Sequence, residues 1–132
     1  MGACYSVEMR MKCRDERKTV AALQKFIREN PAKADFSLAK YAAEGVGTET
    51  LDDLVRIFLA GWRSQPFRKE DDGDGFVAYS NSFDASYGWE RVMIDMFFAV
   101  GETLCDGSEL NIDCDDGVDQ VVVEGGSVTQ IR

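Results

Sequence analysis

The sequence contains no histidine, which removes the most common general base and the most common zinc ligand of proteins. It also lacks a G-x-S-x-G motif, a phosphate-binding glycine loop and an HExxH motif. Its four cysteines form no CxxC pair. These absences favour a non-catalytic protein, with no cofactor expected. A small enzyme of an unrecognised class stays open as an alternative.

No stretch of about 18 apolar residues is present, and the chain does not start with the basic and then apolar segment of a secretory signal. We therefore expect a cytoplasmic protein with reduced thiols, while two disulfides in a secreted protein remain the alternative. Residues 1–6 match the spacing for N-myristoylation. An acidic chain is repelled by an anionic leaflet, however, so we predict no membrane partner.

Basic residues are scarce in the second half of the chain. Residues 1–70 carry 13 basic and 10 acidic side chains, whereas residues 71–132 carry 2 basic and 14 acidic ones. The net charge is therefore +3 for the first part and −12 for the second, against −9 for the whole chain. A field of one sign over half a domain attracts partners of the opposite sign and repels nucleic acid.

The composition, 45% apolar and 30% charged over 132 residues, predicts a single globular domain spanning residues 1–132. Its clearest element is a helix over residues 89–104, with large apolar residues at 89, 92, 93, 96, 97, 100 and 104. Ser86 is the expected N-cap and Gly107 the expected end of this helix. Arg91 and Asp95 lie one turn apart and can pair.

Alternation of apolar and polar residues predicts a first strand over residues 4–13. Helices are expected from Asp15 to Glu29, after Ser37, and from Thr50 to Trp62, followed by a polar connection over 63–75. A strand over 76–83, the helix at 89–104 and a meander over 109–115, 120–124 and 127–131 complete the chain. This β-α-α-α-β-α-β-β-β order predicts an α+β fold. We expect a mostly antiparallel sheet of about five strands with helices on one face, in an arrangement compatible with a decorated ferredoxin-like fold.

The predicted meander carries most of the candidate binding residues. Glu109, Asp113 and Asp115 are spaced by two or four residues and should stand on one side of one strand. Asp116, Asp119 and Glu124 are expected to extend this negative surface. Like charges side by side destabilise a sheet, so their presence suggests a benefit in binding. The alternative is a solvated face whose carboxylates give solubility and prevent edge pairing.

The segment from Glu70 to Gly75 is similar to the opening of a calcium-binding loop, with acidic residues at Glu70, Asp72 and Asp74 followed by a glycine. The bidentate carboxylate expected at position 12 is replaced by Asn81, and the sequence after Gly75 predicts a strand. A flexible acidic turn is therefore the first expectation. A small calcium-, other divalent-metal- or ligand-binding regulatory domain is the alternative.

These observations favour an acidic interaction protein that docks its carboxylate-rich sheet on a basic protein surface and can block it. Small inhibitors of nucleic-acid machines, including phage anti-defence proteins of the anti-CRISPR kind, act as nucleic-acid mimics in this way, which is an analogy of charge and size only. A basic cluster near the first strand and helix is expected to face the protein's own carboxylates rather than to bind nucleic acid directly. It comprises Arg10, Lys12, Arg14, Arg17 and Lys18.

Overall fold

The computed structural model describes residues 2–30, 37–59, 67–115 and 117–132. These residues form an α+β fold with a six-stranded antiparallel sheet in the order β2-β3-β1-β4-β5-β6. The strands are β1 (Gly2–Met11), β2 (Arg68–Asp71), β3 (Val77–Ser86), β4 (Glu109–Cys114), β5 (Gly117–Glu124) and β6 (Ser127–Gln130). The helices are α1 (Glu16–Glu29), α2 (Leu38–Ala43), α3 (Leu51–Phe58) and α4 (Trp89–Val100), followed by a 3-10 turn, η2 (Gly101–Thr103).

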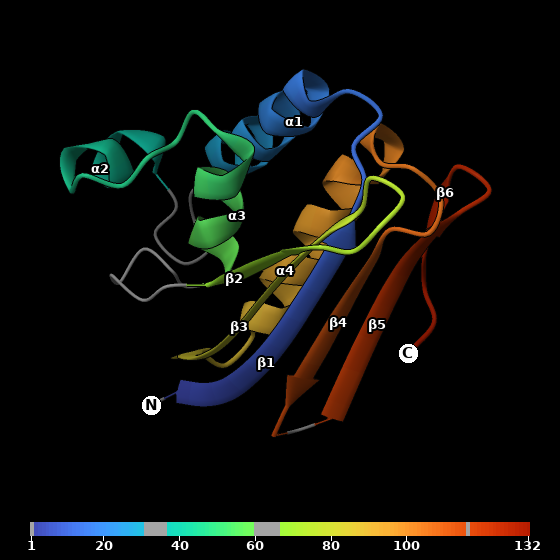
Figure 1. Cartoon of the computed structure of the whole chain (residues 1–132). Helices are drawn as coiled ribbons and strands as arrows, with labels where there is room; N and C mark the ends of the chain where they lie inside the picture. Colours follow the sequence, from blue (N-terminus) through green and yellow to red (C-terminus); the bar gives the residue numbers. More distant parts are fainter. Residues whose placement is uncertain (1, 31–36, 60–66, 116) are drawn as a thin grey trace.

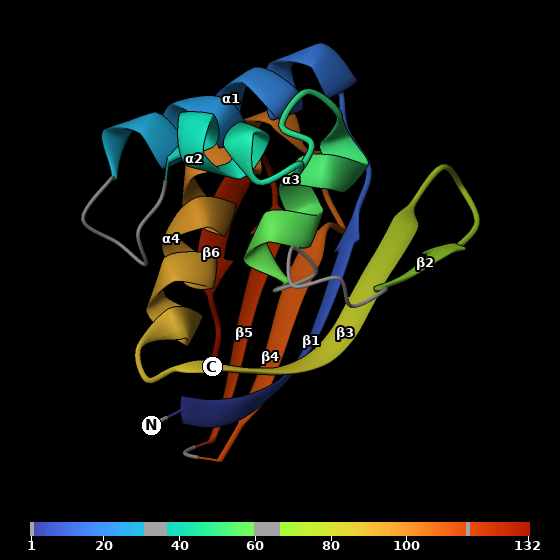
Figure 2. The same cartoon turned by 90° about the vertical axis from the view of Figure 1, so that its left-hand side faces the viewer.

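The described helices all lie on one face of the sheet, which gives a two-layer molecule (Figures 1 and 2). The core lies between the layers, because alternate residues of each central strand point toward the helices. From the sheet, Tyr5, Met9 and Leu110 are at most 1% exposed, and from the helices Phe58 and Phe97 are fully buried. The opposite face, which we call the outer face, has no described helix packed on it (Figure 2).

The apolar stripe of α4 packs on the sheet and α1, and the predicted ion pair is present, with Arg91 Nε 3.1 Å from Asp95 Oδ1. The predicted ends of this helix were wrong. The N-cap is Gly88, at a φ of 94°, and Ser86 is the last residue of β3. The helix passes into η2 after Val100 and thus ends before Gly107.

Three helices begin where the sequence predicted. The side chains of Asp15, Ser37 and Thr50 accept from backbone amides at the starts of α1, α2 and α3. The predicted end of the third helix at Trp62 lies outside the described residues. The structure adds one strand, β2, within the predicted polar connection; its four charged residues are all exposed, so hydrophobic alternation could not reveal it. The ferredoxin-like arrangement is not confirmed.

Candidate binding surface

The outer face is built from the side of each strand that does not contact the core. In β1, Tyr5, Val7 and Met9 are buried beneath the helices, so Cys4, Ser6, Glu8 and Arg10 point outward. Residues that pair with these four on the neighbouring strands also point outward. Ser6, for example, lies between Ser82 of β3 and Asp113 of β4. The face is hollowed over β2, β3, β1 and β4 by a shallow cavity of about 480 Å³, whose charged lining residues are Glu8, Arg68 and Asp113.

The structure divides the carboxylates that the sequence had grouped. Glu109, Asp113 and Glu124 belong to the outer face, and Asp115 is exposed in the turn directly after β4. Asp116 lies outside the described residues. Asp119 does not belong to the outer face, because it pairs with Ile112, which is buried beneath the helices.

Asp119 instead faces the start of α4. It lines a small cavity of about 130 Å³ together with Glu90 and Cys114. Burial, and then the negative charge of Glu90, raise the pKa of Asp119, which the positive charge of Arg91 only partly offsets. Glu90 also accepts a 2.6 Å hydrogen bond from the hydroxyl of Tyr5. Asp119 therefore belongs to a polar site between the layers and cannot contact a partner bound to the outer face.

Basic residues of the first half neutralise one end of the sheet. Arg10 pairs with Asp72, donates to the carbonyl of Gly107 at 3.0 Å and stacks on the ring of Phe76 at 3.8 Å. Arg10 also lies directly opposite Glu109 in the register. At the same end Arg14 lies 4.0 Å from Asp106, as the predicted internal role of the basic cluster requires.

The other end of the outer face carries carboxylates without ion pairs to the described part of the chain. Four residues make up this outer acidic patch: Glu8, Asp84, Asp113 and Asp115. Glu8 and Asp113 lie diagonally across β1 and β4, since Asp113 pairs with Ser6 and Asn111 pairs with Glu8.

Cys4 lies close to the other two members of the patch, Asp84 and Asp115. Its thiol donates to Asp84 Oδ1 at 3.0 Å. The pKa of Cys4 is raised, first by the hydrogen bond to Asp84 and by the charge of this carboxylate, then by burial and by the charge of Asp115. Asp84 and Asp115, which are far apart in the sequence, therefore act on the same thiol. A raised pKa also makes Cys4 a poor nucleophile at neutral pH.

Sequence reasoning missed Asp84 and Glu8 as members of this surface. Glu8 could be placed on the wet face of its strand, but the sequence contains no signal for which strand lies beside it. Asp84 lies beyond the predicted end of its strand, which extends to Ser86. Both residues enter the patch through the pairing of β1 with β3 and β4.

The candidate metal residues lie in and after β2, in a β-hairpin with β3. Glu70 lies 4.0 Å from Arg68, and Asp72 pairs with Arg10. Asp74 adopts a positive φ of 54° in the tight turn. Over the ranges that the structure describes, no three histidine, cysteine or acidic residues are grouped to hold a metal ion.

Comparison of the chain with protein-family models, with curated proteins and with solved structures finds no match. Among the described helices, none has both the length and the hydrophobicity needed to cross a bilayer. All four cysteines are free thiols, and only Cys4 is exposed.

Proposed function

We propose that this protein is a non-catalytic, acidic interaction protein that docks the outer face of its sheet on a basic protein surface. One observation carries the proposal: four carboxylates from three adjacent strands and a turn converge on a face that no described helix covers. These are the carboxylates of the outer acidic patch. No described lysine or arginine forms an ion pair with them.

Electrostatics favours this use of the patch. Carboxylates on neighbouring strands repel one another, although no two of the patch are directly opposite in the register. A partner that places lysine or arginine side chains over Glu8, Asp84 and Asp113 relieves this repulsion. Attraction between the two surfaces also speeds their encounter, and it weakens as salt shortens the reach of the field.

The partner that fits this surface best is a protein whose basic groove normally holds phosphates. Carboxylates on a sheet can replace those phosphates, so the protein would act as a nucleic-acid-mimicking inhibitor without binding nucleic acid itself. Its net charge of −9 supports this, since it disfavours contact with DNA or RNA. Four free cysteines fit a reducing, cytoplasmic setting.

The test is capture of proteins from the native host on the immobilised chain, followed by quantitative comparison of variants. The patch variant is Asp113→Lys with Asp115→Lys. The matched control is Glu29→Lys with Glu44→Lys, which makes the same change in charge at exposed positions of the helical layer. The expected partner is retained by the wild type and by the control, and lost from the patch variant.

Two further properties identify such a partner. Its retention should fall as salt increases, and a DNA or RNA duplex added in solution should displace it. Equal retention of every captured protein by the patch variant and the control would overturn the proposal. Circular dichroism of both variants confirms that the fold is intact.

A further inference from the structure

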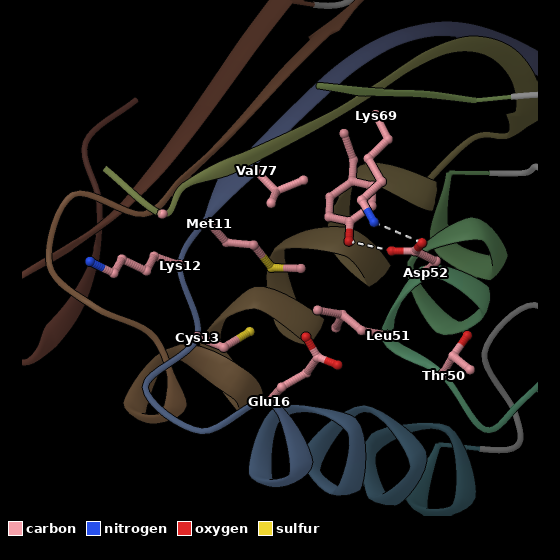
Figure 3. Close-up of a pocket in the computed structure, with 11 residues that line it drawn as sticks. Met11, Lys12, Cys13, Glu16, Thr50, Leu51, Asp52, Lys69 and Val77 are labelled. Carbon is pink, nitrogen blue, oxygen red and sulfur yellow. Dashed lines mark hydrogen bonds and ion pairs between the residues drawn. The ribbon is translucent and has the colours of Figure 1, made fainter. Parts of the chain in front are cut away.

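A second site lies in the helical layer, away from the outer face. It is a cavity of about 370 Å³ between the start of α1, the start of α3 and the inner side of β1, β2 and β3 (Figure 3). Binding pockets for small molecules usually span roughly 300–1,000 Å³, so this cavity fits a small metabolite rather than a peptide or a nucleotide. None of the sequence patterns pointed to it.

One side of the cavity holds an ion pair between Lys69 and Asp52. Asp52 accepts a 2.6 Å hydrogen bond from the hydroxyl of Tyr79 and a 2.9 Å hydrogen bond from Nζ of Lys69 (Figure 3). These two bonds fix the Asp52 carboxylate and orient Lys69. An ammonium group has three donors, so two remain for a ligand.

The other side is negatively charged. Glu16, in the first turn of α1, directs its carboxylate toward the cavity (Figure 3). The described residues include no hydrogen-bond or ion-pair partner for it. Burial raises the pKa of both Cys13 and Tyr79, which lie on the cavity wall, and the charge of Glu16 adds a smaller contribution.

The floor between these charges is apolar. Met11 and Leu51 are buried at 3% and 8% exposure, and Val77 is half-buried. The cavity wall thus carries two ammonium groups, those of Lys12 and Lys69, two carboxylates, those of Glu16 and Asp52, and an apolar surface. An anion without a compensating charge would be repelled by the acidic chain, whereas a neutral zwitterion would not.

We propose that this cavity binds an α-amino acid with an apolar side chain. The carboxylate of the ligand pairs with Lys69, its ammonium group pairs with Glu16, and its side chain packs on Met11, Leu51 and Val77. This site does not depend on the proposed docking function, because its residues belong to the helical layer and to the inner side of the sheet.

Titration with L-leucine, followed by amide NMR shifts, tests the assignment. The comparison ligands are 4-methylpentanoate, which lacks the ammonium group, and 3-methylbutylamine, which lacks the carboxylate. Leucine should shift the amides of Cys13, Leu51, Lys69 and Val77 in a saturable way. Each comparison ligand should bind at least about tenfold more weakly, because it loses one charge-assisted hydrogen bond.

Two variants separate the two ends of the ligand. Glu16→Gln should weaken binding of leucine and leave that of 4-methylpentanoate unchanged. Lys69→Met should weaken binding of leucine but not that of 3-methylbutylamine, because the variant also frees the Asp52 carboxylate for an amine. The matched controls, Glu29→Gln and Lys25→Met, change exposed residues of α1 outside the cavity and should bind leucine like the wild type.

Three results would overturn the proposal. The first is that L-leucine, L-methionine and L-phenylalanine all fail to shift the cavity amides. The second is that the single-charge analogues bind as tightly as leucine. The third is that the cavity variants and the controls show equal affinity. Thermal melting of each variant establishes that a loss of binding reflects the cavity and not the fold.

Discussion

Replacement of Tyr79 by phenylalanine should destabilise the protein in a way that depends on pH. The hydroxyl of Tyr79 donates to Asp52 at 2.6 Å, and Tyr79 is only 1% exposed. A hydrogen bond to a charged group contributes about 1.5–3 kcal/mol, and Asp52 keeps its bond from Lys69 in the variant. We therefore expect Tyr79→Phe to lower the free energy of unfolding by about 1.5–3 kcal/mol at pH 7.

The pH dependence follows from the pKa of Asp52. Burial alone raises this pKa, but hydrogen bonds from Tyr79 and Lys69 outweigh burial and lower it. A carboxyl group with a lowered pKa stabilises the fold above its unfolded pKa of about 3.9, and this stability is lost as the pH falls through the folded pKa. The difference between Tyr79→Phe and the wild type should thus be full at pH 7 and shrink below about pH 4.

Urea denaturation at pH 7 and at pH 3 measures both quantities. Tyr87→Phe is the matched control, because it removes the same hydroxyl from a residue that is 56% exposed. It should change the free energy of unfolding by no more than about 0.5 kcal/mol. A loss of stability in Tyr79→Phe that is equal at both pH values would refute the role of the Asp52 charge. A loss no larger than that of the control would refute the hydrogen bond itself.

Three further changes probe other parts of the fold. Phe97→Ala should cost about 3–5 kcal/mol of unfolding free energy, measured by urea denaturation, because this side chain of α4 is fully buried. Asp106→Ala removes the acceptor for the amides of Gly125 and Gly126, each at 3.0 Å, and should speed hydrogen exchange at both amides. Asp119→Asn should raise the melting temperature at pH 7, since a carboxyl group with a raised pKa destabilises the fold once it ionises, and this gain should vanish at pH 3.

The sequence predicted the helical layer better than the sheet, because a helix is encoded by neighbouring residues. The apolar stripe of α4 and the capping side chains of Asp15, Ser37 and Thr50 are local signals, and the structure contains each of them. The predicted N-cap at Ser86 was wrong because β3 continues to this residue and Gly88 then turns the chain in the left-handed region.

The face assigned to Asp119 was wrong although the sequence contained the necessary signal. Residues of a strand alternate in direction, so Val121 and Val123 place Asp119 on the buried side. The cavity beside Lys69 had no comparable signal. Its charged residues come from α1, α3, β2 and the segment after β1, and only tertiary packing brings Glu16, Asp52 and Lys69 together.

The basic and acidic residues that are segregated in the sequence lie at opposite ends of the sheet, and the strand register explains this arrangement. Residues 2–9 of β1 include no lysine or arginine, and the first basic residue is Arg10. Because β1 is antiparallel to both neighbours, its start lies beside Asp84 at the end of β3 and Asp113 at the end of β4. Arg10 and Arg14 can therefore pair with acidic residues only at the far end, where they contact Asp72 and Asp106. Arg68 of β2 lines the hollow of the outer face together with Glu8 and Asp113, so a basic partner of the proposed kind should approach from the end that carries Asp84 and Asp115.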